Sequence, residues 1–97
     1  MDFQVKPPTK RLKEICAKLG DNYSVRLFDL EQVIYRDFGN GYDVEVSGLN
    51  HNRNEYDAVI YVWHTEPNSI CETIKNIHSF EALLSALNKI EAKYSDC

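Results

Sequence analysis

Alternation of apolar and polar residues between short turns constrains the fold of this chain more than any other feature. Residues 23–28 and 42–46 alternate at period two, which is typical of strands with one buried face. Residues 32–38 lie between these runs and are followed by Gly, Asn and Gly. Residues 56–63 are apolar at nearly every position, which predicts a central strand. Because short connections join antiparallel neighbours, the sequence predicts an antiparallel meander.

The Asn40-Gly41 dipeptide predicts a two-residue type I′ hairpin turn between residues 32–38 and 42–46. In that register Arg36 lies opposite Glu45, which has the opposite charge. A helix over residues 29–35 is the alternative to the first of these strands. The hairpin register predicts an inward face made of Val33, Tyr35, Tyr42, Val44 and Val46. It predicts an outward face made of Ile34, Arg36, Phe38, Asp43, Glu45 and Ser47.

Two amphipathic helices are predicted to enclose the meander. Residues 9–19 begin with Thr9 as a helix cap, carry apolar residues at helical spacing and end before a glycine. Residues 80–94 follow Ser79, a second cap, and carry a long apolar stripe. Residues 70–77 have isoleucines at helical spacing, but their β-branched content favours a strand. The expected fold is therefore α+β, with a meander of four to five strands flanked by an N-terminal and a C-terminal helix.

The size and composition of the chain predict one ordinary globular domain. The 97 residues fit a single α+β domain over 1–97, with residues 1–8 and 95–97 expected to be mobile ends. A content of 43% hydrophobic and 27% charged residues excludes the disordered, fibrous and membrane classes. The chain has no apolar stretch typical of a secretory signal or a membrane span. Its three cysteines are spaced unlike a disulfide framework, so we expect reduced thiols and a cytoplasmic location.

No group of residues predicts catalysis, a cofactor or a metal site. His64, Cys71 and His78 are seven residues apart, whereas structural zinc sites use closely spaced pairs of ligands. The glycines around Asn40 lack the lysine and the strand-to-helix setting of a phosphate-binding loop. No nucleophile motif surrounds any serine or cysteine. We therefore expect no enzyme, no bound metal and no cofactor.

Charge is distributed unevenly along the chain. Residues 1–26 contain six basic and three acidic residues, whereas residues 27–66 contain two basic and eight acidic residues. A row of carboxylates on a sheet can imitate the phosphates of a nucleic acid and attract a basic groove on a host protein. Exposed aromatic residues would anchor such an interface. The predicted partner-binding residues are Asp37, Asp43, Glu45, Glu55, Asp57, Tyr61 and Trp63.

The small size, acidic sheet, order of elements and absence of catalytic residues resemble the small proteins of bacteriophages and mobile elements, including the anti-CRISPR inhibitors. The run Tyr23-Ser24-Val25-Arg26-Leu27 after a short first helix is the local feature that carries this resemblance. The resemblance implies stoichiometric sequestration of a host nucleic-acid-binding protein, such as a CRISPR effector nuclease, in the bacterial cytosol. No functional residue is carried over from that group.

Three other interpretations remain open from the sequence. The first is a structural or self-associating protein, in which two copies form a homodimer through Val59, Tyr61 and Trp63. The second is nucleic-acid binding through the basic N-terminal helix, because the order of elements is similar to that of double-stranded-RNA-binding domains. Those domains bind phosphate through a lysine cluster before the last helix, where this chain has Lys75 alone. The third is that the carboxylates only keep the sheet soluble.

Overall fold

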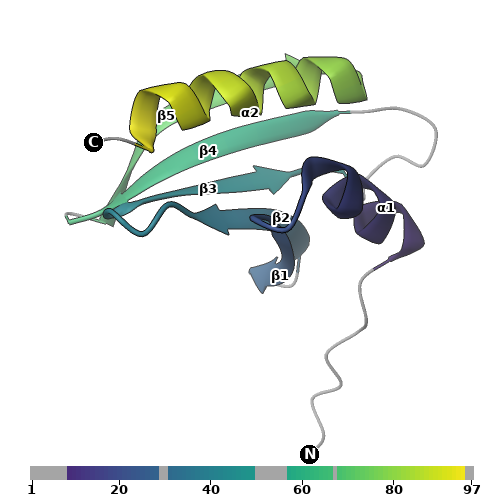
Figure 1. Ribbon diagram of the computed structural model, residues 1–97, viewed down its shortest axis with the longest axis horizontal. Coiled ribbons are helices and arrows are strands. Elements are labelled where there is room, and N and C mark those ends of the chain that lie inside the picture. Colours follow the sequence, from purple (N-terminus) through teal and green to yellow (C-terminus); the bar gives the residue numbers. More distant parts are fainter. Residues whose placement is uncertain (1–8, 29–30, 50–56, 67, 96–97) are drawn as a thin grey trace, which may run out of the picture.

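The computed structural model describes residues 9–28, 31–49, 57–66 and 68–95. Within these ranges it contains two helices and one five-stranded sheet (Figure 1). The strands follow one another in the sheet in chain order, and every neighbouring pair is antiparallel. The predicted α+β fold is confirmed. In chain order the elements are α1 (Lys10–Leu19), β1 (Ser24–Phe28), β2 (Glu31–Asp37), β3 (Tyr42–Ser47), β4 (Ala58–Thr65), β5 (Asn68–Ile77) and α2 (Phe80–Tyr94).

Both helices contribute to a single hydrophobic core on one face of the sheet. In Figure 1, α2 runs along β4 and β5, and α1 lies beside β2. The buried side chains of α1 and α2 belong to the same core cluster as alternate residues of β3 and β4. These core side chains are Leu12, Ile15, Leu83, Leu87 and Ile90 from the helices and Val44, Val46, Ile60 and Val62 from the strands. We call the opposite side the open face, because no described helix covers it.

Local signals at the helix ends account for the boundaries of both helices. The Thr9 hydroxyl accepts a hydrogen bond from the Leu12 backbone N–H, at 3.3 Å between the two atoms. The Ser79 hydroxyl accepts one from the Ala82 backbone N–H, at 3.0 Å. Each cap satisfies an N–H group that the first turn of a helix leaves without a partner. The predicted helices 9–19 and 80–94 are confirmed, as is the strand interpretation of residues 70–77.

The predicted register between β2 and β3 is wrong by one residue. Arg36 pairs with Val44, and Tyr35 pairs with Glu45. The connection over residues 38–41 is longer than a two-residue turn: the Phe38 backbone N–H donates to the Tyr42 carbonyl at 3.0 Å. Two glycines in this connection have positive φ, 78° at position 39 and 94° at position 41. The alternative of a helix over residues 29–35 is also wrong for the described part of that range, because β2 begins at residue 31.

A slip of one residue moves every side chain of a strand to the other face. Ile34 and Arg36 therefore point toward the helices, and Phe38 packs against the core, contrary to the prediction. Val33 and Tyr35 belong to the open face instead of the inner one, and Val33 is buried there. The faces predicted for residues 42–47 are correct, because they depend only on the alternation within β3 itself.

Strand β4 is not the central strand that its apolar sequence predicts. The strand order places β3 in the centre and β4 next to the edge strand β5. Residues 58, 60 and 62 of β4 are buried against the helices. Its outward apolar residues are half-buried, and no described helix covers them. They form part of the open face, and these residues are Val59, Tyr61 and Trp63.

Candidate functional site

The open face brings most of the predicted partner-binding residues together. Cross-strand pairing of β2, β3, β4 and β5 places Asp37, Asp43, Trp63 and Ile70 in one row. The next row contains Tyr35, Glu45, Tyr61 and Thr73. Five of the predicted residues therefore share one surface. Asp57 is exposed just before β4, and Glu55 lies outside the described residues.

A hollow of about 300 Å³ lies on the open face and opens to solvent. Every strand of the sheet contributes at least one residue to it. Sequence reasoning found three of the lining residues and missed three. The lining residues are Phe28, Tyr35, Asp43, Glu45, Trp63 and Asn68.

Two of the missed residues lie next to each other at this hollow. The Phe28 and Tyr35 rings meet edge to face, with 5.5 Å between their centroids. Phe28 is 37% exposed although it is a large apolar side chain. The guanidinium of Arg26 lies 5.3 Å from the centroid of the Tyr35 ring. Alternation from residue 23 onward places Arg26 and Phe28 on one face of their strand, but the predicted register turns Tyr35 toward the helices and so hides its contact with them.

A short hydrogen bond joins Tyr35 and Asp43 in the hollow. The Tyr35 hydroxyl donates to Asp43 Oδ2 at 2.6 Å. Desolvation, this hydrogen bond and the charges of Asp43 and Asp37 all raise the pKa of Tyr35 well above its usual value of 10. The phenol therefore stays protonated at every physiological pH and remains a donor to the carboxylate.

The carboxylate of Asp43 is held in an unfavourable setting. Its second oxygen, Oδ1, is covered and has no hydrogen-bond partner among the described residues. Asp37, which is also acidic, lies directly opposite Asp43 in the β2–β3 pair. Like charges at opposite positions destabilise a sheet by about 0.2–1 kcal/mol, and an unsatisfied polar atom costs about 1–3 kcal/mol. Such local conflicts in an otherwise consistent sequence are expected at functional sites.

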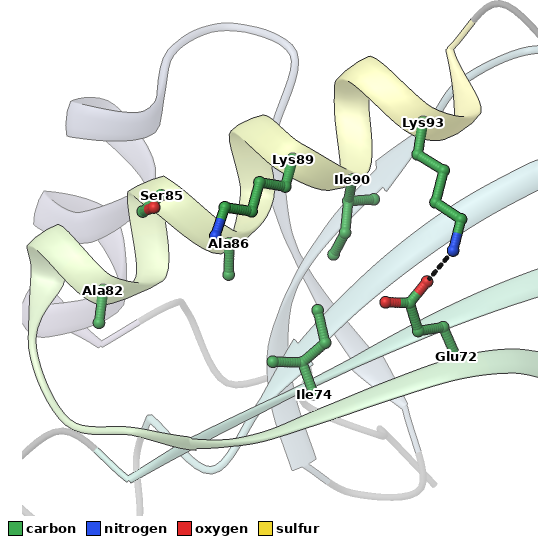
Figure 2. Close-up of a pocket in the computed structure, with 8 residues that line it drawn as sticks. All are labelled: Glu72, Ile74, Ala82, Ser85, Ala86, Lys89, Ile90 and Lys93. Atoms are coloured by element: carbon green, nitrogen blue, oxygen red, sulfur yellow. Dashed lines mark hydrogen bonds and ion pairs between the residues drawn. The ribbon is translucent and has the colours of Figure 1, made fainter.

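A second concavity lies between α2 and the edge strand β5 (Figure 2). It has a volume of about 380 Å³, and Figure 2 shows Ile74 and Ile90 facing each other across it. Lys93 Nζ lies 3.0 Å from Glu72 Oε1 at one end. The Tyr94 hydroxyl donates to the same oxygen at 2.7 Å. This concavity is mainly apolar, and its one described ion pair joins α2 to β5.

The hydrogen bonds to Glu72 should make the free energy of unfolding fall at acidic pH. Hydrogen bonds from Tyr94 and Lys93 lower the pKa of Glu72 below its usual value of 4.5. A group with a lowered pKa in the folded state stabilises the protein above its unfolded pKa. That contribution is lost as the pH falls through the folded pKa. We expect Glu72→Gln to flatten the loss of stability below about pH 5, measured as urea midpoints between about pH 3 and pH 7. A midpoint that falls as steeply in the variant as in the parent protein would contradict this role.

The histidines and cysteines do not assemble a reactive centre in the described part of the chain. No three His, Cys, Asp or Glu side chains there lie in a group that could hold a metal ion. The His64 ring instead packs on the Tyr42 ring, with 4.5 Å between centroids. Burial raises the pKa of the Cys16 thiol, which disfavours the reactive thiolate. Cys71 is exposed, and Cys97 lies outside the described residues.

Comparison with known proteins gives no information on the role of the open face. Among the described residues, neither helix is long and apolar enough to cross a membrane. No family model matches the chain, and no curated protein or solved structure is detectably similar to it.

Proposed function

We propose that the protein is a non-enzymatic binding module whose open face docks onto a basic surface of another protein. The observation that carries this proposal is the juxtaposition of carboxylates and partly exposed aromatic rings on one sheet face that no described helix covers. Aromatic residues are enriched in protein interfaces and often dominate their binding energy. Carboxylates beside them select a partner of opposite charge and speed the encounter.

The partner that fits this surface best is a protein with a nucleic-acid-binding groove. Such grooves are lined by lysine and arginine, which bind phosphates through long-range attraction and direct contacts. Acidic side chains fixed on a sheet compete for the same groove. The resemblance to anti-CRISPR inhibitors makes a CRISPR effector nuclease the specific candidate, inhibited by stoichiometric occupation of its nucleic-acid channel.

Self-association through the same face is the second candidate, and the charges oppose it. Two copies that stack their open faces would bring the acidic residues of both copies toward one another. Each copy would offer the exposed Arg26 of the same face against three carboxylates, so Asp37, Asp43 and Glu45 would lose water without a full counter-charge. A basic partner supplies that counter-charge, so we favour a heterologous complex over a homodimer.

The test is inhibition of guide-directed DNA cleavage by a panel of purified CRISPR effector nucleases. The variant Asp43→Asn/Glu45→Gln removes two carboxylates from the open face. The control Glu14→Gln/Asp21→Asn removes two exposed carboxylates on or just after α1 and changes net charge equally. We expect the open-face variant to inhibit at least about tenfold less well, since about 1.4 kcal/mol of lost binding energy corresponds to tenfold. The control should inhibit like the parent protein.

Thermal unfolding separates lost binding from lost folding in this experiment. Neutralising Asp43 relieves its repulsion with Asp37, so the open-face variant should melt at or above the temperature of the parent protein. Equal inhibition by both variants would reject the open face as the docking surface. Failure of the parent protein to inhibit any effector in the panel would reject this class of partner.

A further inference from the structure

The hollow on the open face has the chemistry of a receptor for one cationic side chain. Resting on the proposed function above, we infer that it receives a single arginine guanidinium presented by the partner protein. The lining combines three aromatic rings, from Phe28, Tyr35 and Trp63, with the carboxylates of Asp43 and Glu45. Aromatic faces attract cations through the ring quadrupole, and the carboxylates add direct charge.

The contacts of Asp43 fix the orientation of its carboxylate and leave its charge partly uncompensated. Its Oδ2 already accepts the Tyr35 hydroxyl, which fixes the orientation of the carboxylate. Its Oδ1 is covered and lacks a donor among the described residues, so the charge is only partly compensated. A cation in the adjoining hollow would stabilise this charge electrostatically without displacing the Tyr35 hydrogen bond. A neutral apolar group in the same place would desolvate the carboxylate further.

Both kinds of cation, arginine and lysine, occur beside a ring and a carboxylate in this protein, since Lys93 lies 5.2 Å from the centroid of the Tyr94 ring and contacts Glu72. The Arg26 guanidinium lies over the Tyr35 ring but does not line the hollow. On the other face of the sheet, the Arg36 guanidinium lies 4.7 Å from the centroid of the Phe38 ring while it contacts a carboxylate. A guanidinium is planar, stacks on rings and is less strongly hydrated than an ammonium. Arginine therefore fits this combination of rings and carboxylates better than lysine.

Fluorescence provides a direct test, because Trp63 lines the hollow and is the only tryptophan of the chain. The probe is the blocked tripeptide acetyl-Gly-Arg-Gly-amide, titrated at constant ionic strength. The matched probes replace arginine by citrulline, its uncharged analogue, or by lysine. We expect saturable binding of the arginine peptide with a Kd on the order of 1–10 mM, as a single cation–π and carboxylate contact supports. The citrulline peptide should bind at least about tenfold more weakly.

Two variants locate the binding event in the hollow. Glu45→Gln should weaken binding of the arginine peptide about three- to tenfold, because it removes one lining charge and keeps the shape. Glu14→Gln, an exposed carboxylate on α1, should leave it unchanged. Absence of saturable binding, equal binding of the citrulline or lysine peptide, or equal effects of the two variants would overturn the inference.

This titration uses no partner protein, so its failure is distinguishable from failure of the proposed function. If the arginine peptide does not bind but Asp43→Asn/Glu45→Gln still abolishes nuclease inhibition, the open face is the docking surface and the guanidinium receptor is wrong. If the arginine peptide binds as expected but no effector nuclease is inhibited, the guanidinium receptor stands and the nuclease partner is wrong.

Discussion

Replacement of Gly48 by alanine is expected to lower the free energy of unfolding by about 3 kcal/mol. Gly48 follows β3 and has φ of +86°, a region that costs a residue with a side chain about 1–2 kcal/mol. A Cβ at this position would lie 2.4 Å from the backbone carbonyl oxygen of Asp57. Because the backbone fixes the position of a Cβ, and the Asp57 oxygen is itself a backbone atom, neither can rotate away and the start of β4 would have to shift. Urea unfolding measures the loss.

Gly39 provides the matched control for this substitution. Its φ of +78° is similar, but a Cβ added there would meet no atom within 4 Å. Gly39→Ala should therefore show the conformational cost alone, about 1 kcal/mol. The difference between the two losses in the free energy of unfolding measures the cost of the clash between the added Cβ and the Asp57 carbonyl oxygen. Equal losses would show that this approach does not constrain the β3–β4 connection.

The helices and strands were predictable because several local signals agree at each of them. Ser79 combines a cap with the apolar stripe that follows, so α2 begins where both signals place it. Thr9 and Gly20 bound α1 in the same way. Alternation within β3 assigned Asp43 and Glu45 to the outer face without reference to any partner strand. The position of these two residues on the outer face could therefore be predicted from local sequence alone.

The register of β2 could not be predicted because its sequence permits both faces. Val33 and Ile34 are adjacent and both apolar, so either could face the core. The Asn40-Gly41 dipeptide favours a two-residue turn, but the chain uses positive φ at both Gly39 and Gly41 and makes a longer connection. This slip concealed the contribution of Tyr35 to the hollow. The register of such a strand is decided by contacts between residues that are far apart in the sequence.

Arg36 shows how a plausible local pairing can mislead. The predicted pairing with Glu45 joined opposite charges across a hairpin, but Arg36 lies on the inner face. There its guanidinium contacts Glu91 of α2 at 3.1 Å, although the two residues are 55 positions apart in the chain. The guanidinium also lies over the rings of Tyr23 and Phe38. One side chain therefore ties the end of β2 to the last helix.

Replacement of Arg36 by alanine is expected to lower the free energy of unfolding by about 2–4 kcal/mol. Its side chain is 13% exposed, so the substitution removes packing against two aromatic rings as well as the ion pair. Glu91→Gln should cost about 1 kcal/mol or less, because the Glu91 side chain is 45% exposed and an amide oxygen can still accept the hydrogen bond.

Arg26→Ala is the matched control for the Arg36 substitution, since it removes an exposed arginine that also lies over an aromatic ring. It should change the free energy of unfolding by no more than about 1 kcal/mol, as is usual for exposed cation–π contacts. Urea unfolding followed by Trp63 fluorescence measures all three variants. A loss for Arg36→Ala no larger than that for Arg26→Ala would mean that the apolar stripe and the contacts of Lys93 and Tyr94 with Glu72 hold α2 without help from Arg36. In that case the contact between Arg36 and Glu91 would contribute nothing to the attachment of α2 to the sheet.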